Sequence, residues 1–265
     1  QLNTKQSSIE TLQTQCESHE NTISDLHARI AQQLAEISQL EQDKRDAEMM
    51  RRKLHNHIQE LKGNIRVMCR VRPLLPSDPD QTNGDDQLAF QFPSRNGGRI
   101  IEVQDGAGSS SGAPQNFKFD KVFPPGTQQK DVFEEISQLV QSSLDGYNTC
   151  IFAYGQTGSG KTFTMEGDSG ENRGMIPRAV AQLFERTKDL QALGWEYAFK
   201  VNYLEIYNET IRDLLTKAKS DEKLAIKHNG DGNPYVPQLT VVPVEVPAQI
   251  EHLLKTATKR RSVGA

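Results

Sequence analysis

Hydrophobic and polar positions follow two different patterns on the two sides of Gly63. Residues 1–62 contain no Gly and no Pro, whereas residues 63–265 contain all 19 Gly and all 12 Pro of the chain. In residues 1–62, apolar side chains recur in a heptad that has Leu2 as its first a position and Lys5 as its first d position. A sustained heptad without helix breakers predicts one helix of about 90 Å, at 1.5 Å per residue, that forms a coiled coil.

The residues at the a and d positions indicate how these helices associate. Ile prevails at a and Leu at d, a combination that favours a parallel two-stranded coil, so we expect a homodimer through residues 1–62. Lys44 and Arg51 occupy a positions, and Glu36 would face Glu41 of the second copy across a parallel dimer. These charges leave two interpretations open: a plain dimerisation rod, or a rod with a weakened stretch that opens close to the following domain.

After Gly63 the pattern changes to that of a mixed α/β domain. An apolar spacing of three and four residues predicts an amphipathic helix over residues 132–144, which ends near Gly146. The Gly- and Ser-rich residues 104–116 predict a loop. The continuous apolar run Thr149–Tyr154 predicts a strand that is buried on both faces. The other predicted strands cover residues 65–71, 88–92, 99–103, 117–123, 224–228 and 236–246.

A glycine-rich loop follows the predicted strand 149–154 directly. Its sequence, Gly-Gln-Thr-Gly-Ser-Gly-Lys-Thr, matches the phosphate-binding pattern G-x-x-x-x-G-K-[ST] between a strand and a helix. Backbone N–H groups of such a loop bind phosphate oxygens, and the start of the following helix adds its positive dipole end. We expect Lys161 to reach the β- and γ-phosphates and Thr162 to bind Mg²⁺. The predicted nucleotide contacts in the loop are Gly155, Gln156, Thr157, Gly158, Ser159, Gly160, Lys161 and Thr162.

Composition and charge narrow the possible partners. The 265 residues include 31 Lys and Arg against 35 Asp and Glu, a net charge of -4 that argues against non-specific nucleic-acid binding. No apolar run approaches the 18 residues or so of a membrane-spanning helix, so we expect no membrane insertion. Cys16, Cys69 and Cys150 are too scattered for a metal cluster and too few for a disulfide framework, which favours a reducing, intracellular setting.

Four segments of the domain together resemble a kinesin motor domain. They are Asn-Ile-Arg-Val-Met-Cys-Arg-Val-Arg-Pro over residues 64–73, Phe-Asp-Lys-Val-Phe over 119–123, the strand and loop over 151–162, and Tyr-Leu-Glu-Ile-Tyr-Asn-Glu over 203–209. The resemblance spans residues 64 to about 265. The order of rod first and motor second is similar to the C-terminal-motor, minus-end-directed kinesin-14 class, and within it to the spindle kinesins that crosslink and slide microtubules.

The resemblance implies roles for residues outside the loop. Arg70, Arg72 and Pro73 resemble the Arg-x-Arg-Pro segment that lies against adenine, and Phe163 matches the position that packs on the other side of the base. The alternative is that the two arginines are ordinary strand residues and Phe163 belongs to the core. The guanine-specific Asn-Lys-x-Asp sequence is absent from the chain, which favours ATP. Tyr203–Tyr207 is expected in the core of the sheet, and Gly174–Arg178 as a turn before a helix.

The two switch segments of the kinesin family, which position the attacking water and sense the γ-phosphate, have no match in the 265 residues. The chain stops at Ala265, in a segment that resembles the helix before the first switch. We therefore expect a motor truncated before its switch regions, which is inactive alone and exposes the edges of strand 149–154. Residues 224–246 resemble a hairpin that contacts tubulin in kinesins; the alternative is a plain surface hairpin.

Together these observations predict an α/β P-loop NTPase of the kinesin type, with a mixed sheet flanked by helices in residues 63–265 and a coiled-coil stalk or neck in residues 1–62. The expected function is that of an ATP-dependent, minus-end-directed microtubule motor with Mg²⁺ as its cofactor. The expected location is the cytoplasm, on the microtubules of the cytoskeleton and mitotic spindle. Two alternatives stay open: a non-motile dimeric module that binds microtubules or motors, and a P-loop ATPase that acts on another partner.

Overall fold

The computed structural model of the chain describes residues 2–76, 90–93, 97–103, 114–216 and 224–261. Two compact units make up the chain, residues 1–58 and residues 59–265. Residues 88–89 of the predicted strand 88–92 and residues 104–113 of the predicted loop lie outside the described residues. The loop prediction is wrong for Gln115 and Asn116, which begin strand β4 (Gln115–Lys118). Each unit has its own architecture, the first a single helix and the second a mixture of helices and short strands.

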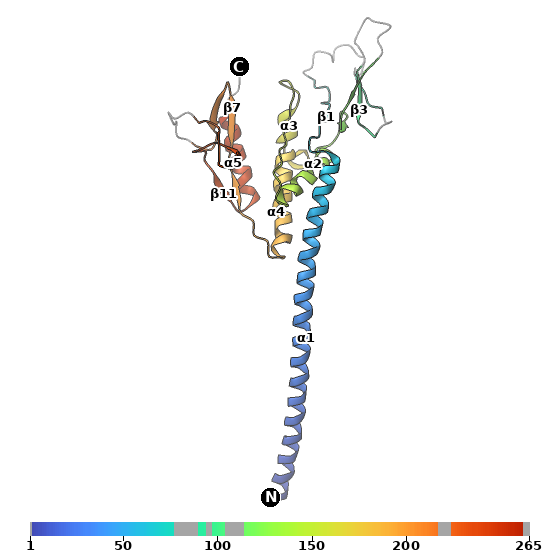
Figure 1. Cartoon of the computed structure of the whole chain (residues 1–265), viewed down its shortest axis with the longest axis vertical. Coiled ribbons are helices and arrows are strands. Elements are labelled where there is room, and N and C mark those ends of the chain that lie inside the picture. The colour runs from blue at the N-terminus through green and yellow to red at the C-terminus, as the bar shows by residue number, and fades with distance from the viewer. Residues whose placement is uncertain (1, 77–89, 94–96, 104–113, 217–223, 262–265) are drawn as a thin grey trace. The chain divides into compact units, whose positions relative to one another are not determined.

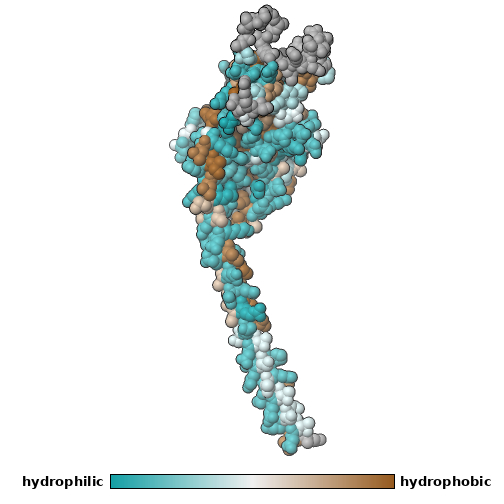
Figure 2. All heavy atoms as spheres, turned by 90° about the vertical axis from the view of Figure 1, so that its right-hand side faces the viewer, coloured by the Kyte–Doolittle hydropathy of each residue, from teal (hydrophilic) through white to brown (hydrophobic). Residues whose placement is uncertain are grey.

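Helix α1 covers Leu2–Lys62 without interruption, which confirms the helix predicted from the heptad (Figure 1). It ends where Gly63 adopts a left-handed conformation, with φ 95°, and donates its N–H to the Glu60 carbonyl at 3.0 Å. The heptad residues are exposed along the helix, for example Ile23 at 53% and Leu40 at 60%. Hydrophobic side chains are visible among the polar ones along this rod (Figure 2). The association of two such helices stays a prediction.

The helices of the second unit supply most of its core. Helix α2 (Gln129–Leu144) confirms the predicted amphipathic helix and buries Val132, Ile136, Val140 and Leu144. It packs against α4 (Met175–Gln191), as Figure 1 shows. On α4, Val180 forms a further cluster with residues of a strand and of α5 (Pro247–Arg260). A short helix, α3 (Lys161–Met165), and a turn of 3-10 helix at Gly170–Asn172 lie between α2 and α4 in the sequence.

The strands of the described residues form five small sheets. One sheet is parallel and pairs β1 with β5. The other pairings are antiparallel: β2–β3–β4, β6 with β11, β7 with β8, and β9 with β10. The strands are β1 (Met68–Arg70), β2 (Phe90–Gln91), β3 (Ile100–Val103), β4 (Gln115–Lys118), β5 (Lys121–Phe123), β6 (Phe199–Val201), β7 (Leu204–Tyr207), β8 (Thr210–Asp213), β9 (Lys227–His228), β10 (Pro234–Tyr235) and β11 (Val242–Val244).

The single mixed sheet predicted from the sequence is therefore wrong for the described residues. The predicted strand Thr149–Tyr154 is not assigned to any sheet, and the prediction that it is buried on both faces is also wrong. Phe152 is 79% exposed and Tyr154 is 96% exposed. A central strand is buried only when strands pair with both its edges and helices cover both its faces, and no described strand pairs with this segment.

One further strand prediction and one core prediction need correction here. The predicted strand 117–123 is divided, because β4 ends before Phe119 and β5 begins after Asp120. The Asp120 carboxylate accepts a hydrogen bond from the Val67 N–H at 2.8 Å, which draws the chain away from β4 and toward the segment before β1. The predicted core position of Tyr203–Tyr207 is wrong for part of that segment, because Ile206 is 62% exposed and Tyr207 50% exposed on the two-stranded hairpin β7–β8.

The predicted strands 224–228 and 236–246 are present only in part. A hairpin joins β9 and β10, and its turn is closed by the Asn229 side chain, which accepts hydrogen bonds from the N–H groups of Asp231 at 3.1 Å and Asn233 at 2.8 Å. The second strand of this hairpin is Pro234–Tyr235, which lies between the two predicted strands and outside both. Further along, only Val242–Val244 pairs, with β6.

Candidate nucleotide-binding site

The glycine-rich loop forms a tight turn that leads into α3. Gly158 and Gly160 have φ of 80° and 92°, in the left-handed region that L side chains rarely adopt. Gly160 is also the residue that caps the start of α3. The loop is closed by a hydrogen bond from the Ser159 N–H to the Gln156 carbonyl at 3.2 Å. These two glycines are thus favoured by the backbone conformation, independently of any ligand.

Several backbone donors of the loop are available to a ligand. Within the part of the chain that the structure describes, the N–H groups of Gly158, Gly160, Lys161 and Thr162 donate no hydrogen bond. They are consecutive or nearly so, and they lie where a loop becomes a helix. Such an arrangement of N–H groups favours an oxyanion, because each group carries a partial positive charge. The geometry fits the predicted phosphate cradle.

The Lys161 ammonium lies against the beginning of the same loop. It donates hydrogen bonds to the carbonyl oxygens of Gly155 and Gln156, both at 2.8 Å. Both partners are neutral carbonyls, and phosphate oxygens are stronger acceptors for an ammonium group because they are charged. A bound triphosphate could therefore compete with these two carbonyls for the Lys161 amine, as the sequence predicts.

Thr162 meets the requirements for a single Mg²⁺ ligand. Its side chain is exposed, and its hydroxyl makes no hydrogen bond to any described residue. The described residues contain no group of three or more His, Cys, Asp or Glu side chains that could hold a metal ion. Mg²⁺ characteristically keeps several waters and binds through one or two protein oxygens together with nucleotide phosphates. The donor set at Thr162 therefore fits a magnesium ion that arrives with a nucleotide.

The structure brings together two of the residues that the resemblance places at the base. The Arg70 guanidinium lies over the Phe163 ring, 5.4 Å from its centroid, a distance compatible with a cation–π contact. The same guanidinium donates to the Thr164 hydroxyl at 2.8 Å, next to Phe163 on α3. Burial lowers the pKa of Arg70, which nevertheless stays charged at neutral pH. Arg72 is half-buried and Pro73 is exposed, so their predicted base contacts rest on the resemblance alone.

A close turn after α3 fixes the position of this short helix. The Gly174 N–H donates to the Glu166 carbonyl at 2.9 Å, and the Asp168 N–H donates to the Asn172 carbonyl at 3.0 Å. A Cβ atom at Gly174 would lie 2.6 Å from the Glu166 carbonyl carbon. Gly174 is the residue before α4, and Met175–Arg178 already belong to this helix, so the turn predicted over Gly174–Arg178 is wrong apart from its first residue. This contact packs the start of α4 against the end of α3.

Sequence reasoning missed Gln129, which joins the parts of this site. Its side chain is 3% exposed at the start of α2 and makes hydrogen bonds to Arg70, Phe163 and Asn172. A buried Gln in the first turn of an amphipathic helix is a local departure from the apolar pattern. This polar residue at an apolar position is the one feature of the sequence that points to Gln129.

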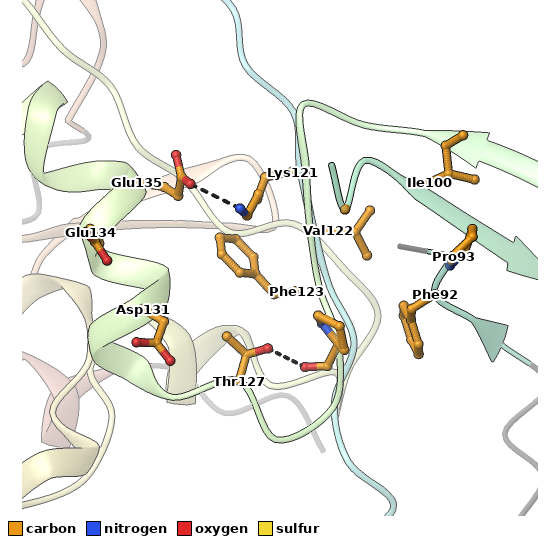
Figure 3. Close-up of a pocket in the computed structure, with 12 residues that line it drawn as sticks. Phe92, Pro93, Ile100, Lys121, Val122, Phe123, Thr127, Asp131, Glu134 and Glu135 are labelled. Carbon is orange, nitrogen blue, oxygen red and sulfur yellow. Dashed lines mark hydrogen bonds and ion pairs between the residues drawn. The ribbon is translucent and has the colours of Figure 1, made fainter. Parts of the chain in front are cut away.

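A cavity of about 490 Å³ is lined by residues outside the glycine-rich loop (Figure 3). Its wall includes Phe92, Val122 and Phe123, and α2 contributes acidic side chains to its rim. Of these, Glu135 forms an ion pair with Lys121 at 3.5 Å. None of the predicted nucleotide contacts lines this cavity, so it is not the predicted site.

Comparison with known proteins identifies the family. A family model described as microtubule binding matches residues 44–215. The chain is 47% identical over 234 residues to kinesin-like protein KIN-14D of Arabidopsis thaliana, covering 83% of this chain and 29% of that protein. It is 47% identical over 241 residues to kinesin-like protein KIFC1 of Homo sapiens, covering 82% and 35%. The chain belongs to the kinesin-14 family of motor-domain proteins. It spans about a third of the length of the curated relatives it matches.

Solved kinesin structures have the same fold as this kinesin-14 chain. A C-terminal motor and motor homology domain of Kar3Vik1, fused to a synthetic heterodimeric coiled coil, superposes with a TM-score of 0.81 at 36% identity and covers 93% of this chain and 64% of that one. The motor domain of the Kar3-like kinesin from Ashbya gossypii gives 0.60 at 41% identity, covering 73% and 58%. The kinesin motor-domain fold with a long N-terminal helix is confirmed. Among the described residues, no helix is long and apolar enough to span a membrane.

Proposed function

We propose that this kinesin-14 chain binds Mg-ATP through residues 155–162 and supplies the nucleotide site of a minus-end-directed microtubule motor. The observation that carries the proposal is the structure of the loop. Several of its N–H groups donate no hydrogen bond within the described residues, and the Lys161 ammonium lies against the same loop at the start of α3. The kinesin-14 relatives support the assignment to a motor. The proposed place of action is the microtubules of the cytoskeleton and spindle.

Different residues of the chain would bind the phosphates, the Mg²⁺ ion and the base. The N–H groups of the loop and Lys161 would offset the negative charge of the phosphates, and the Thr162 hydroxyl would hold Mg²⁺. When bound, Mg²⁺ neutralises part of the charge on the β- and γ-phosphates. Arg70 and Phe163 would contact the base from one side, because their separation of 5.4 Å is less than the roughly 7 Å that a purine stacked between them would need. In a motor, such a site transmits the state of the nucleotide to the polymer-binding surface through the switch segments.

The proposed quaternary state is a homodimer through residues 1–62. The a and d side chains of α1 are exposed along its length, for example Ile9 at 52%, Leu26 at 47% and Leu54 at 57%. In a two-stranded coil these side chains would leave water by packing between the helices, which stabilises the dimer by about 25 cal/mol per Å² of buried apolar area.

The proposed motor function is tested by ATP turnover with and without microtubules. We expect stimulated turnover from a longer chain that continues through the two switch segments, and none from the 265-residue chain alone. The reason is that hydrolysis needs a group that positions the attacking water as well as a phosphate cradle. A longer chain that binds microtubules without turning over ATP would contradict the motor and favour the non-motile module. Stimulated turnover by the 265-residue chain would contradict the role given to the switches.

A further inference from the structure

Gln129 is buried and makes three hydrogen bonds to residues of the nucleotide site, although it has no role in the proposed binding of ATP. Its side chain is 3% exposed, and its Oε1 accepts a hydrogen bond from the Arg70 guanidinium at 2.8 Å. Its Nε2 donates to the Phe163 carbonyl at 2.6 Å and to the Asn172 carbonyl at 3.3 Å. One buried amide thereby joins β1, the helix that follows the loop, and the turn before α4.

The chemistry of the three partners fixes the orientation of this amide. A guanidinium has only donors, so it must meet the amide oxygen, and the two carbonyls have only acceptors, so they must meet the amide nitrogen. No other orientation of the Gln129 amide satisfies all three bonds. A buried polar group that loses such partners is costly, which makes the arrangement rigid.

Gln129 holds the two segments whose side chains are expected to contact the base. The Arg70 guanidinium lies over the Phe163 ring, 5.4 Å from its centroid. Gln129 makes hydrogen bonds to the Arg70 guanidinium and to the main-chain carbonyl of Phe163. The Gln129 bond also holds Arg70 in reach of the Thr164 hydroxyl, at 2.8 Å. Gln129 itself makes no contact with residues 155–162 among the hydrogen bonds of the described chain. Its hydrogen bonds therefore reach Arg70, on the base side, and the main chain of α3 directly after Thr162.

We propose that Gln129 is a positioning residue for the base side of the nucleotide site, setting the distance between the Arg70 guanidinium and the Phe163 ring. The inference rests on the proposed binding of ATP and deepens it. It assigns the recognition of the base to Arg70, Phe163 and Gln129. Of these three residues, Gln129 does not touch the ligand. The loop N–H groups offered to the triphosphate make no hydrogen bond to these three residues, so we expect the loop to bind the triphosphate without the Gln129 contacts.

Comparison of two ligands tests this division. The wild-type chain, Gln129→Met and Gln128→Met are titrated with a fluorescent ATP analogue and with inorganic tripolyphosphate as its competitor. Met keeps the length of Gln and lacks both hydrogen-bonding groups. Gln128 is the matched control, because it is the preceding residue, is exposed and makes no side-chain capping bond. We expect Gln129→Met to raise the dissociation constant for ATP about tenfold and that for tripolyphosphate less than about twofold. Gln128→Met should change neither.

A double-mutant cycle shows whether Gln129 acts through Arg70. If it does, Gln129→Met should add little to the loss of ATP affinity caused by Arg70→Ala, because the interaction is already absent. Equal losses for ATP and tripolyphosphate, no loss for ATP, or additive losses with Arg70→Ala would overturn the positioning role alone. A wild-type chain that binds neither ligand would overturn the proposed function, and the positioning role with it.

Discussion

Single polar side chains hold together segments that are far apart in the sequence. Asp213, at the end of β8, accepts hydrogen bonds from the N–H groups of Leu215 at 2.8 Å and Thr240 at 2.7 Å. Burial alone would raise the pKa of Asp213, but these hydrogen bonds outweigh it and hold the pKa below its ordinary value of 3.8. The carboxylate thus ties the hairpin β7–β8 to the segment before β11.

The depressed pKa of Asp213 predicts acid sensitivity. A carboxyl group with a lower pKa in the folded than in the unfolded state stabilises the fold fully above its ordinary pKa. That contribution is lost as the pH falls from about 4 toward the pKa of the folded state. We expect Asp213→Asn to lower stability at pH 7 and to flatten the decline between pH 5 and pH 3, as followed by urea unfolding. Asp231→Asn, in an exposed turn, is the control; an equal effect of both changes would contradict the prediction.

How far single residues could be predicted depends on how local their partners are. The loop residues were found from the sequence because eight consecutive positions define the motif. The roles of Gln129 were not, because its partners Arg70 and Phe163 are 59 and 34 residues away in the sequence. A pattern of apolar and polar positions shows that a polar side chain lies on the apolar face of a helix. It does not show which residues that side chain contacts.

At the scale of elements, the helices were predicted better than the strands. The long helix α1 and the amphipathic α2 follow from periodicity within one segment, which the sequence contains in full. A strand depends on partners elsewhere in the chain. The sequence therefore predicted the exposed edges of the apolar run Thr149–Tyr154, while the prediction that both of its faces are buried was wrong. Phe152 and Tyr154 remain exposed because no described strand covers the edges of this segment. Such an edge is prone to pair with another chain.

The contact between α3 and α4 gives a prediction at this scale. Gly174→Ala would place a Cβ 2.6 Å from the Glu166 carbonyl carbon and 2.7 Å from the Gly167 nitrogen, so one of the two elements must shift. We expect a loss of about 1–3 kcal/mol in the free energy of unfolding and a lower melting temperature, measured by circular dichroism. Gly230→Ala is the control, because nothing lies within 4 Å of its Cβ position. Equal melting temperatures for the two variants would show that the contact is not tight.

At the scale of the whole molecule, the sequence indicated the two parts of the chain and the family of the second. The change in pattern at Gly63 falls close to the division of the structure after Ile58. The mixed sheet was expected from the family and is replaced, in the described residues, by five small sheets. Strand pairing depends on residues far apart in the chain, so an order of apolar runs does not determine which of them pair.

The central claim is that residues 155–162 form a working nucleotide site, and equilibrium binding of a fluorescent ATP analogue to the 265-residue chain tests it most directly. The account predicts saturable binding that is stronger with Mg²⁺ and weakened about tenfold to a hundredfold by Lys161→Ala, because a charged hydrogen bond to phosphate is lost. Lys130→Ala, which removes an exposed lysine of α2, should leave the affinity unchanged. Binding that is absent, or that is the same in the wild type and Lys161→Ala, would contradict the account.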